Sequence, residues 1–133
     1  MNEHVHASEK LTKNQSLVLG TLEKADAPLS AYTILDKLRT EGLRAPLQVY
    51  RALEKLVEFG LAHRLESLNA FVACRHSGCG GHKTIAFMIC DQCGHVREIS
   101  DNALAGQLQL LAKKDRFAMK TSTVELRGIC GEC

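Results

Sequence analysis

Several features that would assign the chain to a class of protein are absent from it. No run of about 18 apolar residues occurs, so the sequence predicts no membrane-spanning helix. Residues 1–4 lack the charged start of a secretory signal peptide, and no apolar core follows them, so we expect a cytoplasmic protein. Nucleophile elbows, phosphate-binding loops and paired acid–base motifs are also missing, and we therefore predict that the protein is not an enzyme.

The chain also lacks a large excess of charge of either sign. The formal net charge is only +2 in 133 residues, which argues against a basic tail that binds nucleic acid by bulk electrostatics. If DNA is the partner, a small number of residues at specific positions must contact it. The affinity must then fall with salt according to the number of phosphates that these residues neutralise.

Cysteine, in contrast, is abundant, with six residues in the chain. In a reducing cytoplasm this number is better explained by metal ligands than by disulfides. Two Cys-x-x-Cys turns, which we call knuckles, contain Cys90, Cys93, Cys130 and Cys133. Two such turns brought together complete the tetrahedron of sulfurs that zinc prefers, so we predict one structural zinc site.

Two other roles for the knuckles are weaker. A redox-active Cys-x-x-Cys pair of the thioredoxin type lies at a helix N-terminus after a buried strand, and neither knuckle is expected there. An iron–sulfur cluster uses the same ligand type, but the knuckle geometry is more typical of zinc.

The apolar pattern predicts three helices in the first half of the chain. Thr12 and Gln15 form a capping box ahead of the first helix, Ser30 caps the second, and Pro46 suits the first position of the third. Glycines end the second and third helices.

After the third helix the pattern changes to alternation around the turn-like residues 67–70, which predicts a β-hairpin. Three helices followed by a hairpin is the layout of a winged-helix DNA-binding domain, which we expect at 1–75. The glycine-rich hinge is expected at 76–84, and a second domain at 85–133. The second domain, with three strands and one helix, is a small α/β dimerisation domain that needs a metal and a second copy of the chain. The fold class is therefore mixed α and β.

Specific motifs resemble a known family. They are Ser-Ala-Tyr at 30–32, Val-Tyr-Arg-Ala-Leu at 49–53, Cys-Asp-Gln-Cys-Gly at 90–94 and the final Cys-x-x-Cys. Over about residues 11–133 the chain resembles the ferric uptake regulator family and, within it, the zinc uptake regulator branch. The resemblance implies a zinc-responsive, homodimeric repressor that binds operator DNA, as one or two dimers, and represses zinc-uptake genes. An iron- or peroxide-responsive regulator of the same family is the alternative.

A second metal site is expected around the two remaining cysteines, Cys74 and Cys79. The residue types leave the partners open among His63, His76, His82, His95 and Glu98. Matched position by position, the zinc branch implies a regulatory zinc held by His63, Cys74, His82 and Glu98. Cys79 or His76 remains a substitute for His82, and His95 is expected at the surface.

Two arguments from the residues bear on this regulatory site. A two-residue turn at Leu68-Asn69 would pair His63 directly with Cys74 on one face of the hairpin. One thiolate among nitrogen and oxygen ligands favours zinc over iron or manganese. We therefore expect two zinc ions per subunit, one structural and one regulatory.

The third helix is expected to read DNA. Its apolar face is predicted to consist of Val49, Leu53, Leu56 and Val57. Gln48, Arg51 and Lys55 lie opposite and would point at the major groove. Arg51 is the best base reader, because its fork can bind guanine O6 and N7 together.

Of four further residues, three have two readings each. Tyr50 and Tyr32 are DNA contacts by the family resemblance, and the alternative reading places Tyr50 at the rim of the core. Asp36 and Arg39, three residues apart on the second helix, form either a local ion pair or a link between adjacent dimers.

Overall fold

The computed structural model of the chain describes residues 11–75 and 84–133. It divides into two compact units, Met1–Cys74 (unit 1) and Arg75–Cys133 (unit 2). Nearly all of the expected hinge at 76–84 lies outside the described residues. Among the described helices, none has the length and the apolar content needed to cross a membrane.

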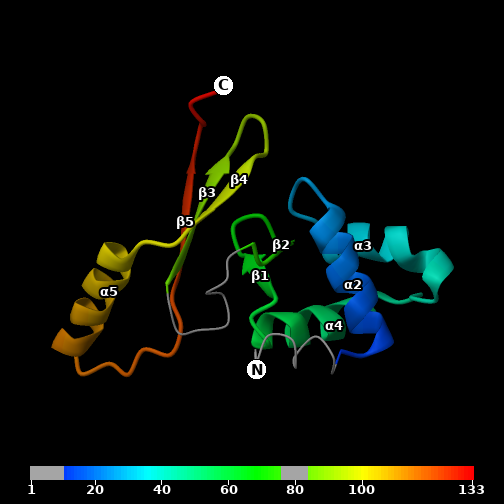
Figure 1. The fold of residues 1–133 in the computed structure, drawn as a ribbon, viewed down its shortest axis with the longest axis horizontal. Coiled ribbons are helices and arrows are strands. Elements are labelled where there is room, and N and C mark those ends of the chain that lie inside the picture. The colour runs from blue at the N-terminus through cyan, green and yellow to red at the C-terminus, as the bar shows by residue number, and fades with distance from the viewer. Residues whose placement is uncertain (1–10, 76–83) are drawn as a thin grey trace. The chain divides into compact units, whose positions relative to one another are not determined.

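Unit 1 is helical in its first part and ends in a hairpin (Figure 1). Its described elements are α2 (Lys13–Lys24), α3 (Ala31–Leu38), the 3-10 turn η1 (Arg39–Glu41), α4 (Pro46–Glu58), β1 (Ala62–Leu65) and β2 (Ala70–Ala73). This order confirms the predicted winged-helix layout of three helices followed by a hairpin.

The predicted helix starts are confirmed by their caps. Thr12 and Gln15 form the capping box of α2, with each side chain bonded to the other's backbone N–H. The Ser30 hydroxyl accepts a hydrogen bond from the backbone N–H of Thr33 at the start of α3. Gly42 follows η1 with φ of 108°, a conformation that favours glycine. Local sequence therefore determines where each of these helices begins or ends.

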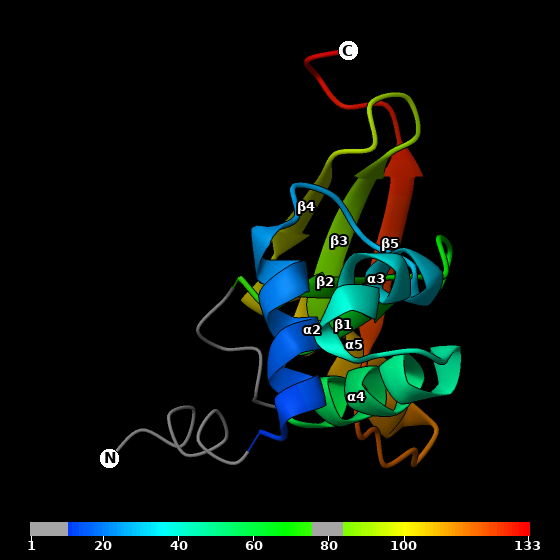
Figure 2. The ribbon, with the colours of Figure 1, turned by 90° about the vertical axis from the view of Figure 1, so that its right-hand side faces the viewer.

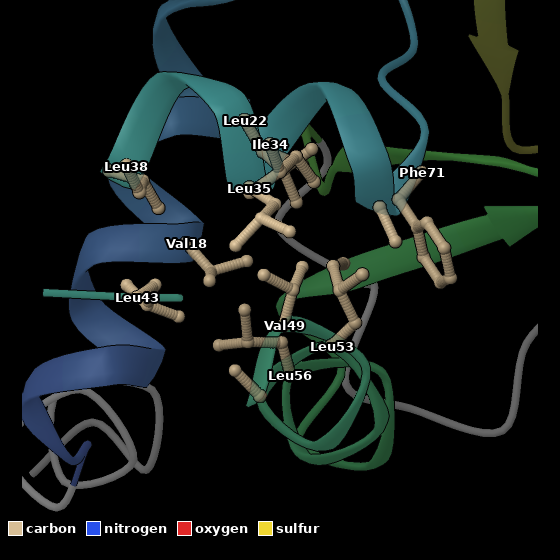
Figure 3. Close-up of a cluster of buried hydrophobic side chains, with 14 of the residues drawn as sticks. Val18, Leu22, Ile34, Leu35, Leu38, Leu43, Val49, Leu53, Leu56 and Phe71 are labelled. Carbon is tan, nitrogen blue, oxygen red and sulfur yellow. The ribbon is translucent and has the colours of Figure 1, made fainter. Parts of the chain in front are cut away.

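The core of unit 1 lies between α2, α3 and α4 (Figure 3). From α4 it takes Val49, Ala52, Leu53 and Leu56, all of which are buried. The prediction that Val57 belongs to this face is wrong, because its side chain is 39% exposed. Each helical residue is rotated by about 100° from the one before it, so Val57 lies beyond the edge of the buried stripe.

The hairpin forms as predicted, but with a longer turn. His63 is paired with Val72 and Leu65 with Ala70, so the turn comprises residues 66–69 rather than Leu68-Asn69 alone. Asn69 closes this turn with φ of 49°, a conformation that asparagine tolerates. The direct pairing of His63 with Cys74 was therefore wrong by two residues. Because side chains alternate with period two, His63 and Cys74 still lie on the same face of the hairpin.

The described part of unit 2 contains a three-stranded sheet and one helix (Figure 2). Its described elements are β3 (Ile85–Cys90), β4 (Val96–Ile99), α5 (Asn102–Lys114) and β5 (Thr123–Gly128). The order is β4-β3-β5, with β4 antiparallel and β5 parallel to the central β3. Helix α5, capped by Asp101, forms part of the crossover that the parallel pair requires.

Burial in unit 2 is concentrated on the central strand. In its described part, every buried residue is either Thr84 or a member of β3. No residue of α5 is buried, and Leu110 and Leu111 on this helix are 57% and 63% exposed. Unit 2 thus has a far smaller hydrophobic core than unit 1.

Candidate metal centre and nucleic-acid interface

The two cysteine knuckles meet beyond the C-terminal ends of β3 and β5 in the unit 2 sheet. Strands β3 and β5 are parallel and their ends are in register, with Cys90 opposite Gly128. The turns that follow the two strands therefore lie at the same end of the sheet, close to the last residue of the sequence (Figure 1). The first knuckle contributes Cys90 and Cys93, and the second contributes Cys130 and Cys133.

The separations of the sulfurs fit a tetrahedral metal ion. The Sγ–Sγ distances are 3.7 Å for Cys90–Cys133, 3.6 Å for Cys93–Cys130 and 3.4 Å for Cys130–Cys133. Zinc–sulfur bonds of about 2.3 Å in a regular tetrahedron place the sulfurs about 3.8 Å apart. A disulfide would need about 2.05 Å, and all four cysteines are free. The donor set and its spacing therefore fit Zn²⁺.

Electrostatics within the cluster favour a bound cation. The backbone N–H groups of Cys93 and Cys130 donate to the Cys90 sulfur and lower the pKa of Cys90 to about 6. Hydrogen bonds shared with the sulfur of Cys130, and then with those of Cys93 and Cys90, raise the pKa of Cys133 to about 12. In the metal-free cluster one sulfur is thus prepared to ionise while another retains its proton. A divalent cation would stabilise all four as thiolates, and its binding would release protons.

A second donor pair lies on the hairpin of unit 1. His63 is on β1 and Cys74 directly follows β2, and both are partly buried. Their ligand atoms lie within 4.8 Å of each other. Cys74 is disulfide-bonded in this structure, so its role as a metal ligand requires the reduced thiol.

The other expected regulatory ligands are distributed differently. Glu98 lies on β4 in unit 2, where its carboxylate accepts a hydrogen bond of 3.2 Å from the backbone N–H of Arg75. His82, and the alternatives His76 and Cys79, lie outside the described residues. His95 is exposed, as expected.

The predicted DNA-contacting side chains occupy the outer surfaces of α3 and α4 in unit 1. Arg51 and Lys55 are exposed, and Tyr32 on α3 is 62% exposed. Lys55 pairs with Glu58 at 3.2 Å, whereas Arg51 has no hydrogen-bond or ion-pair partner in the described part of the chain. The Arg51 guanidinium is therefore available to an external acceptor.

Tyr50 and Gln48 also have structural roles. Tyr50 is partly buried and packs against the core of unit 1, which was the alternative reading for this residue. The side-chain oxygen of Gln48 accepts hydrogen bonds from the backbone N–H groups of Arg44 and Ala45, at 2.8 Å and 3.1 Å. Gln48 thus caps the start of α4, and only its amide nitrogen remains for a ligand.

One exposed residue of α4 was missed by the sequence reasoning. Leu47 is 57% exposed in the first turn of the helix, four residues before Arg51 and therefore adjacent to it on the surface. The signal was available, since an apolar residue breaks the polar face that carries Arg51.

The exposed ion pair of α3 forms locally. The Nε atom of Arg39 donates to Oδ1 of Asp36 at 3.1 Å within the same helix. A pair of this kind contributes little to stability.

Comparison with known proteins gives consistent matches. A model of the ferric uptake regulator family matches residues 6–127. The zinc uptake regulation protein of Escherichia coli (strain K12) is 38% identical over 125 residues, which cover 93% of this chain and 72% of that protein. The ferric uptake regulation protein of Legionella pneumophila is 30% identical over 117 residues, which cover 79% of this chain and 86% of that protein.

Solved structures show the same likeness. A zinc uptake regulator in complex with zinc and DNA has a TM-score of 0.86 at 37% identity, covering 93% of this chain and 83% of that one. The crystal structure of holo XcZur has a TM-score of 0.83 at 41% identity, covering 92% of this chain and 85% of that one. These identities are high enough to compare chemistry as well as fold.

Proposed function

Because the chain belongs to the ferric uptake regulator family, we propose that it is a zinc-responsive transcriptional repressor, which binds double-stranded operator DNA as a zinc-loaded homodimer and represses zinc-uptake genes. As a member of this family it is a regulator rather than an enzyme. It acts in the cytoplasm, where the operator DNA lies. The observation that carries the proposal is the pair of sulfur-containing donor sets, one in each unit.

The first zinc ion of each subunit is structural and is held by Cys90, Cys93, Cys130 and Cys133. The sulfur separations given above support this assignment. The four cysteines tie residues 130–133 to the end of β3, which is the only well-buried strand in the described part of unit 2. They therefore stabilise a unit whose own core is small.

The second zinc ion is regulatory and is held by His63, Cys74, His82 and Glu98. The proximity of the His63 and Cys74 ligand atoms on one hairpin face supports half of this set. A thiolate ligand favours Zn²⁺ over the harder Mn²⁺, and imidazole suits zinc as well. The iron-responsive alternative gains no specific support from these donors.

The proposed ligands come from both units, and this division would make the site a switch. A single ion bound to all four would restrict the two units to one arrangement, in which the α4 helices of a dimer fit successive major grooves. Changing the ratio of DNA-binding to non-binding conformations from 1:99 to 99:1 requires zinc to bind the DNA-binding conformation about 10⁴-fold more tightly than the other. Ligands contributed by both units supply such a preference more readily than ligands within one unit.

Apolar surface in unit 2 supports dimerisation. Leu110 and Leu111 on α5 are exposed, and β5 forms an edge of the sheet with Leu126 exposed on it. A second copy of the chain would cover this surface and pair the open edge. Where two dimers share one operator, the exposed Asp36 and Arg39 would exchange partners between them.

DNA binding is assigned to α4 and to the start of α3. Arg51 would read guanine in the major groove, with Leu47 beside it against a thymine methyl group. Lys55, Tyr32 and the amide nitrogen of Gln48 would contact the backbone. The exposure of Arg51 and Tyr32 supports this assignment, and Tyr50 would contribute mainly by packing beneath this surface.

Operator binding against buffered free zinc tests the proposal. The reduced wild type is expected to retain a duplex selected from a random pool only when zinc is available, with two zinc ions per subunit. Cys74→Ser should lose one zinc ion and the zinc dependence, while the knuckle zinc remains. Cys79→Ser leaves the four proposed ligands in place and should keep both zinc ions; loss of one would assign Cys79 as a ligand in place of His82. Unchanged zinc-dependent binding by Cys74→Ser would show that the proposed regulatory site is wrong.

A further inference from the structure

An ion pair connects the first knuckle to the end of β5, the strand that leads into the second knuckle, without using the cysteine sulfurs. Arg127, near the end of β5, donates from Nε and Nη2 to Oδ1 of Asp91, at 2.9 Å and 2.7 Å. Asp91 lies inside the first knuckle, between Cys90 and Cys93. Its backbone N–H also donates to the carbonyl oxygen of Gly128 at 2.7 Å. The turn that carries Cys90 and Cys93 is therefore joined to the end of β5 by contacts that do not involve the cysteine sulfurs.

We propose that Asp91 and Arg127 are positioning residues, which hold the two knuckles together and so slow the loss of zinc from the cysteine site. The inference rests on the proposed structural zinc. It assigns a role to two residues that are not ligands, and it concerns the retention of the metal rather than its chemistry.

The place of the ion pair in the chain explains why such a contact is needed. The β3–β5 pairing ends at Cys90 and Gly128, so the second knuckle, 130–133, lies beyond the last ladder position. Residues that lie beyond the last paired position of a strand open more easily than paired residues unless other contacts hold them. Arg127 is the last residue of β5 whose side chain can reach across to the first knuckle before the ladder ends. Loss of this contact would let the second knuckle open more often.

Substitutions of Asp91 and of Arg127 change the charge beside the zinc site in opposite directions. Four thiolates around a divalent cation carry a net charge of about −2, and Asp91 adds a further negative charge beside them. Arg127 offsets that charge. Replacing Arg127 therefore breaks the contact and leaves the acid uncompensated, whereas Asp91→Asn removes the charge attraction, keeps at most weaker hydrogen bonds from Arg127, and leaves a favourable cation. If local charge alone mattered, Asp91→Asn would slow zinc release; if the contact matters, both changes accelerate it.

The magnitude is modest because both side chains are about half exposed, at 49% and 46%. An exposed pair of this kind corresponds to about a two- to fivefold change in an equilibrium or a rate. The effect must also weaken as salt screens the pair. It should appear in zinc release, which depends on opening of the few residues beyond the β3–β5 ladder, more clearly than in global melting.

Zinc release from the full-length dimer to a chromogenic chelator tests the inference. Zinc content is measured first, in a Cys74→Ser background, so that only the knuckle site contributes. Asp91→Asn and Arg127→Gln should each release zinc two- to fivefold faster than their parent, and Asp91→Arg with Arg127→Asp should return toward the parental rate. Added salt should accelerate release from the parent but have less effect on the single variants.

The matched control is Glu132→Gln. Glu132 lies in the second knuckle at a comparable distance along the chain from two cysteines, but it has no ion-pair partner among the described residues. It should release zinc at the parental rate or more slowly. Parental rates for Asp91→Asn and Arg127→Gln, or no recovery in the charge-exchanged double variant, would overturn the inference. Absence of zinc from the parent would instead refute the structural site itself.

Discussion

Removing the structural zinc should unfold unit 2 while unit 1 stays folded. The change is Cys130→Ser, which leaves three thiolates and one hydroxyl. The large buried apolar side chains in the described part of unit 2 are Ile85, Phe87 and Ile89. At about 1.5–3 kcal/mol each, these three side chains contribute roughly 5–9 kcal/mol before the cost of ordering the chain is subtracted.

A structural zinc site contributes about 10–16 kcal/mol in small peptides, which exceeds the contribution of this apolar core. Unit 1 has no such dependence, because residues of α2, α3, α4 and the hairpin form its core. Loss of zinc is therefore expected to remove most of the stabilisation of one unit and little of that of the other.

Hydrogen exchange measured by mass spectrometry separates the two units in one experiment. Zinc-free Cys130→Ser should lose the protection of β3 and β5 amides and retain that of α2 and α4. Cys74→Ser, whose replaced cysteine lies outside the knuckles, should keep both. Unchanged protection of β3 in zinc-free protein would refute the argument that the metal, rather than the small core, stabilises this unit.

Two further predictions concern DNA. Arg51→Lys keeps the charge but loses the fork, so discrimination for guanine over other bases in a selected operator should fall by about 1–3 kcal/mol with the salt dependence nearly unchanged, as measured by competition binding. Replacing thymine by uracil in the same duplex should weaken the wild type about three- to fivefold at one position, since one methyl group is removed. Leu47→Ala should not respond to that replacement, whereas the control Val57→Ala should respond like the wild type; equal responses by all three proteins would exclude Leu47 as the contact.

The hairpin illustrates how far sequence reasoning reached. Alternation predicted two strands and the face that carries His63 and Cys74, because side-chain direction depends only on the period of two. The turn was assigned two residues too short. Turn length depends on which backbone conformations residues 66–69 adopt together, such as the left-handed Asn69, and no single residue specified it.

The end of α4 and the knuckles illustrate the same limit. Periodicity predicted an apolar face but included Val57, because burial at the edge of a stripe depends on what packs against it. The parallel pairing of β3 and β5 places both knuckles at the same end of the sheet. The local pattern of apolar and polar residues did not predict this pairing. Asp91 and Arg127 became visible as partners only through this register.

The sequence by itself determined the helix starts, the succession of helices and strands and the paired Cys-x-x-Cys turns, because caps, periodicity and ligand spacing are local properties. Only the tertiary structure decided the hairpin register, the tetrahedral spacing of the four sulfurs and the ion pair that connects the first knuckle to β5. Each of these depends on contacts between segments far apart in the chain. Their geometry is set by strand pairing and packing rather than by the residues of either segment alone.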